Sequence, residues 1–192
     1  MLKYSFLITG LMTVFFSCKQ SKDKEEFTDW KSKGDSLTAQ TFDTLRKTLQ
    51  KAISERGLPG AVEFCNAAAL DLTKTYTDEA IQIKRTSDKI RNPVNTSDEM
   101  EKDVIKAYLE QKKENKQLTA ILKQDSKGNH HYFKPILIQA MCLNCHGAKE
   151  TQIKPDTWDM IQKKYPKDAA FDYKEGDIRG IWHLVFSKEI SK

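Results

Sequence analysis

The apolar positions in the first half of the chain recur at the spacing of two amphipathic helices. Between Ser36 and Arg56 they follow a period of about 3.6 residues, and Ser36 can act as an N-cap. The run Gly57-Leu58-Pro59-Gly60 interrupts this pattern, and Pro59 suits the first turn of a second helix. We therefore predict two helices, Ser36–Arg56 and Pro59–Tyr76, packed as an antiparallel pair.

The second half of the chain combines strand and helix patterns. Alternating apolar and polar residues predict strands at Ile81–Thr86, Leu118–Lys123, His130–Gln139 and Asp177–Ser187. A helix is predicted from Ser97 or Asp98 through Leu109, with Glu101 placed for a capping box, and a short helix over Pro155–Tyr165. Helices followed by several antiparallel strands indicate an α+β domain.

The N-terminus has the pattern of an export signal. Lys3 supplies a positive charge, and the apolar run Phe6–Phe16 is too short to span a bilayer. The run ends at Ser17-Cys18, which resembles the lipobox of bacterial lipoproteins, where the cysteine is acylated and becomes the mature N-terminus. We predict a signal peptide over residues 1–17, a flexible tether over residues 18–35 and one domain over residues 36–192. The lipid on Cys18 would anchor the protein at the periplasmic side of a bacterial membrane. The alternative is an ordinary cleaved signal with an incidental cysteine.

Composition and charge are typical of a globular domain with a charged, solvent-exposed surface. Hydrophobic residues make up 39% of the chain and charged residues 31%, and the formal net charge is +5. Basic residues are scattered among acidic ones, as in Lys22-Asp23-Lys24-Glu25-Glu26, instead of clustering with aromatic residues. A nucleic-acid partner is therefore not expected.

The most specific chemical signal in the chain is Cys142-Leu143-Asn144-Cys145-His146. Two thiols at this spacing can add to the two vinyl groups of one porphyrin, and the adjacent imidazole can bind the iron. The pattern predicts one covalent haem c, with Cys142 and Cys145 as attachment residues and His146 as an axial ligand. Haem is attached to this motif outside the cytoplasmic membrane, which agrees with the export signal. Two alternatives use the same cysteines: a zinc site completed by His130, His131 or His146, and a redox-active disulfide.

Several short motifs, taken in order, resemble those of a known protein family. They are Arg85-Thr86-Ser87 with Arg91-Asn92-Pro93-Val94-Asn95, Lys134-Pro135-Ile136, the Cys142–Gly147 segment, Tyr165-Pro166-Lys167-Asp168-Ala169-Ala170 and Gly176-Asp177-Ile178-Arg179-Gly180. The family comprises small exported single-haem c-type proteins with a PAS-like fold, and related domains form the haem sensor parts of membrane histidine kinases and cyclases. The resemblance extends from about Leu37 to Ser187. One departure is Phe171-Asp172, where the family usually has a glycine before the tyrosine.

The resemblance implies a PAS-like antiparallel sheet with an N-terminal helical hairpin and a haem held against the sheet. It also implies an axial pair made of the motif histidine and a cysteine from the N-terminal helices. Cys65 lies in the matching helix, and it is the cysteine that remains once Cys18, Cys142 and Cys145 are assigned. The alternative role for Cys65 is that of a small buried apolar residue.

Other residues are candidates for contacts to a haem. A distal ligand could also come from His183, His130, His131, Met100, Met141 or Met160. Arg85 and Arg91, with Arg179 as a third, are candidate partners of the two haem propionates, because a buried carboxylate needs a charged partner. The alternative is that these are ordinary surface arginines. Trp182 and Phe186 would pack either in the core or on the porphyrin.

These features favour a membrane-anchored c-type haem protein of the cell envelope. It would act as a one-electron carrier or as a redox- or gas-responsive sensor module, because iron with two protein ligands has no open position for a substrate. No kinase or cyclase segment is recognisable, so a sensor would need a separate partner, which is unknown. The alternative function is a haem enzyme of the peroxidase type, with an open distal face and His183 or His130 as the base.

Overall fold

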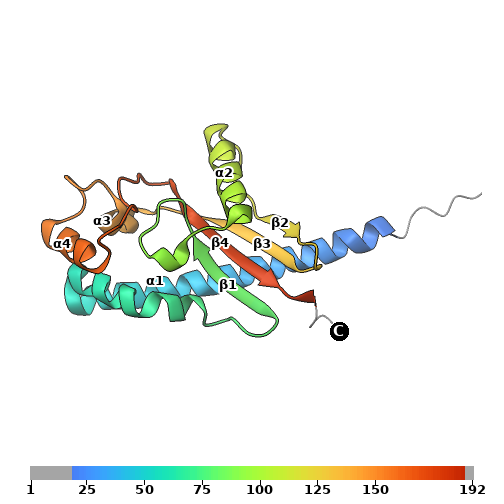
Figure 1. The fold of residues 1–192 in the computed structure, drawn as a ribbon, viewed down its shortest axis with the longest axis horizontal. Coiled ribbons are helices and arrows are strands. Elements are labelled where there is room, and N and C mark those ends of the chain that lie inside the picture. Colours follow the sequence, from blue (N-terminus) through green and yellow to red (C-terminus); the bar gives the residue numbers. More distant parts are fainter. Residues whose placement is uncertain (1–18, 189–192) are drawn as a thin grey trace, which may run out of the picture.

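A four-stranded antiparallel sheet forms the middle of the fold, and helices cover both of its faces (Figure 1). The computed structural model describes residues 19–188. Its strands are β1 (Ile81–Thr86), β2 (Ile121–Gln124), β3 (His130–Leu137) and β4 (Ile178–Phe186), in the order β1-β4-β3-β2. The predicted α+β class and antiparallel sheet are confirmed. β1 has the predicted bounds, whereas β2 begins later and β3 ends earlier than predicted.

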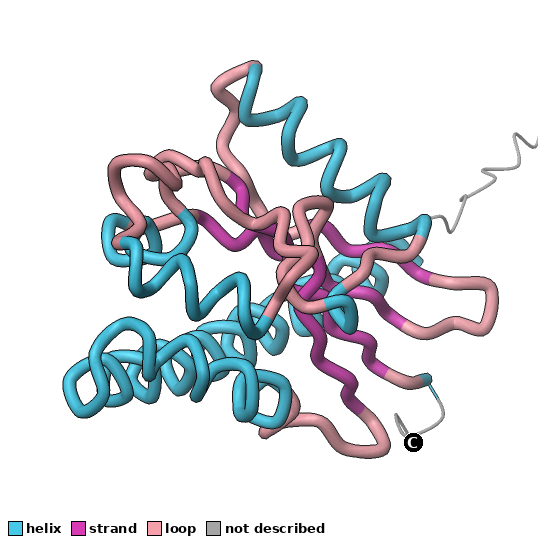
Figure 2. Tube along the Cα trace, turned by 60° about the vertical axis from the view of Figure 1, so that its left-hand side comes forward, coloured by secondary structure: helices cyan, strands magenta, loops and turns pink. Residues whose placement is uncertain are grey.

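The long helix α1 (Lys19–Thr73) contains the predicted break. Gly57 has φ 69° and ψ −178°, a left-handed conformation that costs glycine little and other residues much more. The chain reverses direction there, so the parts of α1 before and after Gly57 run side by side (Figures 1 and 2). We call them the first part and the second part of α1. The predicted helical hairpin is therefore confirmed.

The start of the first helix differs from the prediction. Residues up to 35 were expected to form a tether, but α1 begins at Lys19 and its residues from 30 onward pack on the sheet. The Trp30 ring stacks on His130, with ring centroids 4.9 Å apart. Asp35 accepts hydrogen bonds from the Tyr132 hydroxyl (2.7 Å) and from Lys134 Nζ (2.6 Å). The residues from 30 onward are thus part of a helix that contacts β3.

The two faces of the sheet have different cores. On the face covered by α1, the buried cluster is Ile81, Ile83, Tyr132, Trp182, Leu184 and Phe186. On the other face lies α2 (Glu99–Lys113), which shares a cluster with Phe133 and Ile181. The predicted capping box of α2 is present: Asp98 Oδ1 accepts from Glu101 N–H, and a Glu101 carboxylate oxygen accepts from Asp98 N–H, both at 2.9 Å.

Short elements follow the end of β3 and carry the cysteine motif. The 3₁₀ turn η2 (Ala140–Cys142) leads directly into α3 (Leu143–His146), and α4 (Pro155–Lys164) packs beside the second part of α1. A further 3₁₀ turn, η1 (Pro93–Asn95), is capped by Asn92, whose side chain accepts from Val94 N–H. Within residues 19–188, no helix combines the length and the apolar character needed to cross a membrane. The predicted signal peptide and Cys18 lie outside the described residues.

Candidate functional site

A cavity of about 280 Å³ lies between the helical hairpin and one end of the sheet. Its apolar walls include Leu45 and Leu49 from the first part of α1, Val62 from the second part, Ile136 from β3 and Trp182 from β4. The site residues predicted from the sequence within residues 19–188 all line it: Cys65, Arg85, Arg91, Cys142, Cys145, His146 and Arg179. Phe186 packs in the core cluster instead, and Trp182 belongs to both. The fold thus gathers residues from five separate segments around one space.

His146 is held in a defined orientation at this cavity. Its Nδ1 lies 2.7 Å from the carbonyl oxygen of Ala170, so Nδ1 carries the proton and donates it. Nε2 is then left with a free lone pair. Burial, together with the charges of Arg91 and Arg179, holds the pKa of His146 well below its usual range. The imidazole is therefore neutral and able to bind a metal through Nε2.

The three cysteines at the cavity are free thiols. Burial raises the pKa of Cys145 to about 11, although the charge of Arg91 opposes this. Burial also raises the pKa of Cys65, against the charges of Arg85 and Arg91. A thiolate at Cys65 would therefore need an additional positive charge, such as a bound metal ion.

The zinc alternative does not match this geometry. Among the described residues, no three ligand atoms from Cys65, Cys142, Cys145 and His146 lie within 4.8 Å of one another. His130 and His131, proposed to complete the tetrahedron, do not line the cavity. A zinc ion needs four ligands at about 2.0–2.3 Å, so the cysteine and histidine atoms are too widely spread to hold one.

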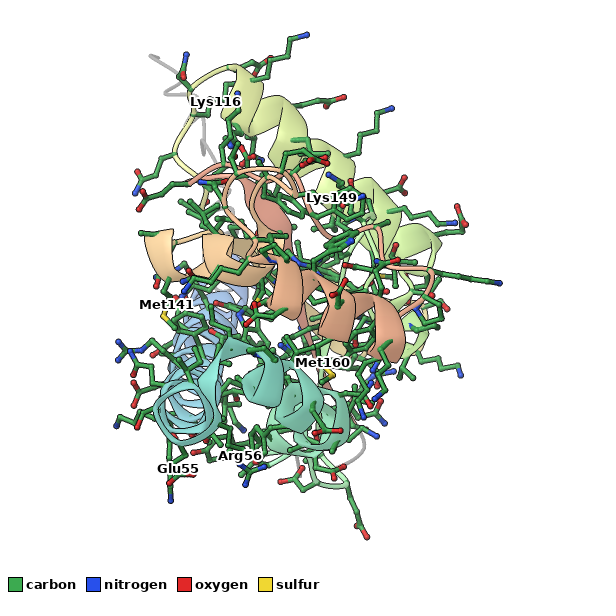
Figure 3. All side chains as sticks on the ribbon, turned by 90° about the vertical axis from the view of Figure 1, so that its left-hand side faces the viewer. Glu55, Arg56, Lys116, Met141, Lys149 and Met160 are labelled. Atoms are coloured by element: carbon green, nitrogen blue, oxygen red, sulfur yellow. The ribbon has the colours of Figure 1, made fainter. Side chains whose placement is uncertain are left out.

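The other candidates for a distal ligand are mostly elsewhere. Met141 lines the cavity and lies beside the first part of α1 (Figure 3). Met160 lies between α4 and the second part of α1 (Figure 3), and Met100 packs in the α2 cluster. His131 and His183 are bonded to each other away from the cavity, and His130 stacks on Trp30. Cys65 and Met141 are thus the predicted distal candidates that the fold brings to the cavity.

Arg91 is engaged by the protein itself. Its Nη2 donates to Cys145 O (2.6 Å) and Ala170 O (3.2 Å), and it forms an ion pair with Asp168 at 2.9 Å. The side chain of Asp168 is fully buried and also accepts from Ala170 N–H at 2.9 Å. Arg91 and Asp168 therefore fix the carbonyl that orients His146. Asp168 belongs to the Tyr165–Ala170 motif but was not among the predicted site residues.

Arg85 and Arg179 have no such carboxylate. Both are half-buried, and neither forms an ion pair in the part of the chain that the structure describes; Arg179 Nη1 donates to Ser87 Oγ (2.9 Å) and Lys89 O (3.0 Å). Arg85 donates to Ala69 O at 3.2 Å and lies over the Trp182 ring, while its buried Nε has no partner. Burial, then the charge of Arg179, lowers the pKa of Arg85 to about 10. Two half-buried cations without carboxylate partners on one cavity favour an anionic ligand there.

The one departure from the family motifs is accommodated by the backbone. Asp172 has φ 59°, the left-handed region that glycine adopts most easily and that aspartate tolerates better than most residues. Asp172 N–H donates to Gly147 O at 2.9 Å, and its side chain accepts from Lys149 N–H at 3.3 Å. Asp172 therefore makes the turn beside His146 in place of the expected glycine.

Comparison with known proteins gives one family and one solved structure. The model of a family described as Tll0287-like matches residues 25–187. The crystal structure of the cyanobacterial haem protein Tll0287 matches with a TM-score of 0.53 and 23% identity, covering 79% of this chain and 95% of that one. At this identity the structural likeness shows the fold alone. No curated protein matches. The family resemblance predicted from the sequence is confirmed.

Proposed function

Because this chain belongs to the Tll0287-like family of single-haem c-type proteins, we propose that its cavity holds one haem c attached through Cys142 and Cys145. One observation carries this proposal: the attachment motif shares a cavity with two half-buried arginines, Arg85 and Arg179, that form no ion pair with any residue in the range 19–188. A haem has two propionates, whose charges these two guanidinium groups would balance. Arg91, already paired with Asp168, is the less favoured of the three predicted partners.

We propose His146 and Cys65 as the two axial ligands. His146 offers the lone pair of Nε2, since its Nδ1 is bonded to Ala170 O. Cys65 faces the same cavity from the second part of α1, and the charges of Arg85 and Arg91 favour its thiolate form. A bound haem supplies one-electron chemistry and, if a weak ligand leaves, a position for a small gas molecule. A thiolate ligand would give a low reduction potential.

These ligands support a role as a one-electron carrier or a redox- or gas-responsive sensor in preference to an enzyme. A peroxidase needs a distal base, and both predicted candidates lie outside the cavity. His183 is bonded to Glu101 and His131, and His130 stacks on Trp30. His146, which serves as the proximal ligand, is the one histidine of the chain at the cavity.

We further propose that the protein is exported and anchored through an acylated Cys18. This rests on the signal-like N-terminus and on the need for haem attachment outside the cytoplasm. The mass of the mature N-terminal peptide tests the proposal. A lipid-modified Cys18 is expected, and an unmodified N-terminus at another residue would contradict it.

The ligand assignment is tested by replacing Cys65 in the haem-loaded protein. We expect the oxidised parent to have a six-coordinate, low-spin spectrum with thiolate character, and Cys65→Ala to lose that character. Val62→Ala is the matched control, since Val62 is buried on the same part of α1 and lines the same cavity. An unchanged spectrum in Cys65→Ala would rule out the thiolate, and a spectrum that changes in Met141→Ala instead would assign methionine.

A further inference from the structure

A chain of hydrogen bonds between titratable groups lies behind the cavity, on the α2 face of the sheet. Asp125 Oδ2 lies 3.3 Å from His131 Nε2, and His131 Nδ1 lies 2.9 Å from His183 Nε2. His183 Nδ1 lies 2.6 Å from Glu101 Oε1, which also pairs with Lys84 Nζ at 2.7 Å. The Glu101 and His183 side chains are 0% and 4% exposed, so water cannot replace the contact between them, whereas Asp125 at the other end is 23% exposed.

The number of protons in this chain is fixed by its hydrogen bonds. Two imidazoles between two carboxylates make three contacts, and each contact needs one N–H because carboxylates only accept. Two neutral imidazoles supply only two N–H groups. With three contacts formed, the histidine pair therefore carries one extra proton and a positive charge. Loss of that proton leaves two lone pairs, or a lone pair and a carboxylate, facing each other in one of the contacts.

The two carboxylates at the ends of this chain of hydrogen bonds are ionised near neutrality. Burial would raise the pKa of Glu101, but hydrogen bonds from His183 and Lys84 bring it down to about 2, so it is ionised near neutrality. Hydrogen bonds from Asn129 likewise keep the pKa of Asp125 at about 2. Burial lowers the pKa of His183, and the hydrogen bond and charge of Glu101 oppose this, while Lys84 and His131 add to the lowering. The net result is a pKa for His183 below its usual value.

A metal ion is a poorer explanation of the same cluster. Ligand atoms of Asp98, Glu101 and His183 lie within 4.8 Å of one another. However, Lys84 Nζ contacts both carboxylates, at 3.3 Å from Asp98 and 2.7 Å from Glu101. The ammonium group therefore already occupies the position that a cation would take.

We propose that His131 and His183 form a binding site for one exchangeable proton, held between Asp125 and Glu101, and that its charge is coupled to the redox state of the haem. The coupling part rests on the proposed function. The sheet register supports it, because Lys84 pairs with His183 and Arg85 pairs with Trp182. Arg85 and Trp182 line the cavity on one face of the sheet. The adjacent residues Lys84 and His183 belong to the proton site on the opposite face. A proton bound there favours the reduced haem, which carries one positive charge less.

The proton count is tested directly by ¹⁵N NMR of the histidine side chains in the reduced protein. Between about pH 5 and about pH 9, we expect the four ring nitrogens of His131 and His183 to change from three N–H groups to two. Asp125→Asn should abolish the change, since an amide can donate to His131 Nε2 and no third proton is needed. Glu101→Gln should do the same from the other end of the chain. Two N–H groups at every pH, or a change that survives both substitutions, would overturn the proton site.

The coupling is tested by the midpoint potential of the haem over the same pH range. We expect the potential to fall as pH rises, by at most a tenfold change in equilibrium constant per pH unit, which is about 59 mV for one electron. Asp125→Asn should flatten this dependence, whereas His130→Gln, on the same strand outside the chain of bonds, should retain it. An equal slope in the parent and in Asp125→Asn would overturn the coupling. A colourless protein would refute the haem proposal, but the NMR experiment would still test the proton site.

Discussion

The three arginines predicted as propionate partners contact different groups, and we infer different roles for them from this difference. Arg91 bonds to two carbonyls and to Asp168, so it holds the loop that orients His146. Arg85 and Arg179 are likewise half-buried but line the cavity without a carboxylate partner among the described residues. Their positive charges would be costly without an anion, which makes them the favoured propionate partners.

Replacing Arg85 should lower the reduction potential of the bound haem. Arg85→Gln removes a positive charge that favours the reduced form, an effect of roughly 1–2 kcal/mol or tens of millivolts. Arg46→Gln is a matched control, because Arg46 lines the same cavity but already pairs with Asp43 at 2.9 Å. Redox titration of both variants checks this expectation. Equal potentials in Arg85→Gln and the parent would show that Arg85 does not interact with the haem.

Individual site residues could be predicted from the sequence where their chemistry is local. The spacing of Cys142, Cys145 and His146 is evident from the sequence. Cys65 was predicted because it is the cysteine that remains once the others are assigned, and because it lies in the helix that the family resemblance indicates. The partner of Arg91 could not be found in this way, because Asp168 lies 77 residues further along the chain. Glu101 was recognised as a helix cap, and nothing local indicated its second contact, with His183, 82 residues away.

At the scale of elements, the first part of α1 depends on close contact with the sheet. Gly34 is buried against the Tyr132 ring, and a Cβ at this position would overlap that ring. Asp35 then bonds to the hydroxyl of Tyr132. The helix can lie this close to β3 because position 34 has no side chain.

Substitution of Gly34 should therefore destabilise the protein. Glycine to alanine within a helix normally stabilises by about 0.5–1 kcal/mol, but overlap with Tyr132 should reverse the sign and cost roughly 1–3 kcal/mol. Ser32→Ala, at an exposed position of the same helix, should change stability by less than about 0.5 kcal/mol. Urea unfolding of both variants measures the difference. A stabilised Gly34→Ala would contradict the packing of residues 30–35 on the sheet.

Most elements were predictable because their periodicity is strong. The bounds of β1, the break at Gly57 and the capping box of α2 all follow from local patterns. The start of α1 was not predicted, since residues 19–35 are mostly polar and their helical state is fixed by contacts of Trp30 and Asp35 with distant strands. Tertiary contacts outweigh weak local preference in such segments.

The whole molecule places two chemical sites back to back across one sheet. The cavity lies on the side of the helical hairpin, and the histidine–carboxylate chain lies on the side of α2. The alternation of side chains along β1 and β4 produces this arrangement, since Arg85 and Trp182 point one way and Lys84 and His183 the other. The α+β class was predictable, but the buried chain of bonds arises from strand register and was not.

The central claim is that Cys142 and Cys145 bind one haem covalently. The most direct measurement is the haem content of the unfolded chain, after export in a host with haem-attachment machinery and acidic solvent extraction. We predict that one haem per chain remains bound, as measured by intact mass and a pyridine haemochrome spectrum, and that the Cys142→Ala/Cys145→Ala variant retains none. A chain without haem, or with haem that the solvent removes completely, would contradict the account.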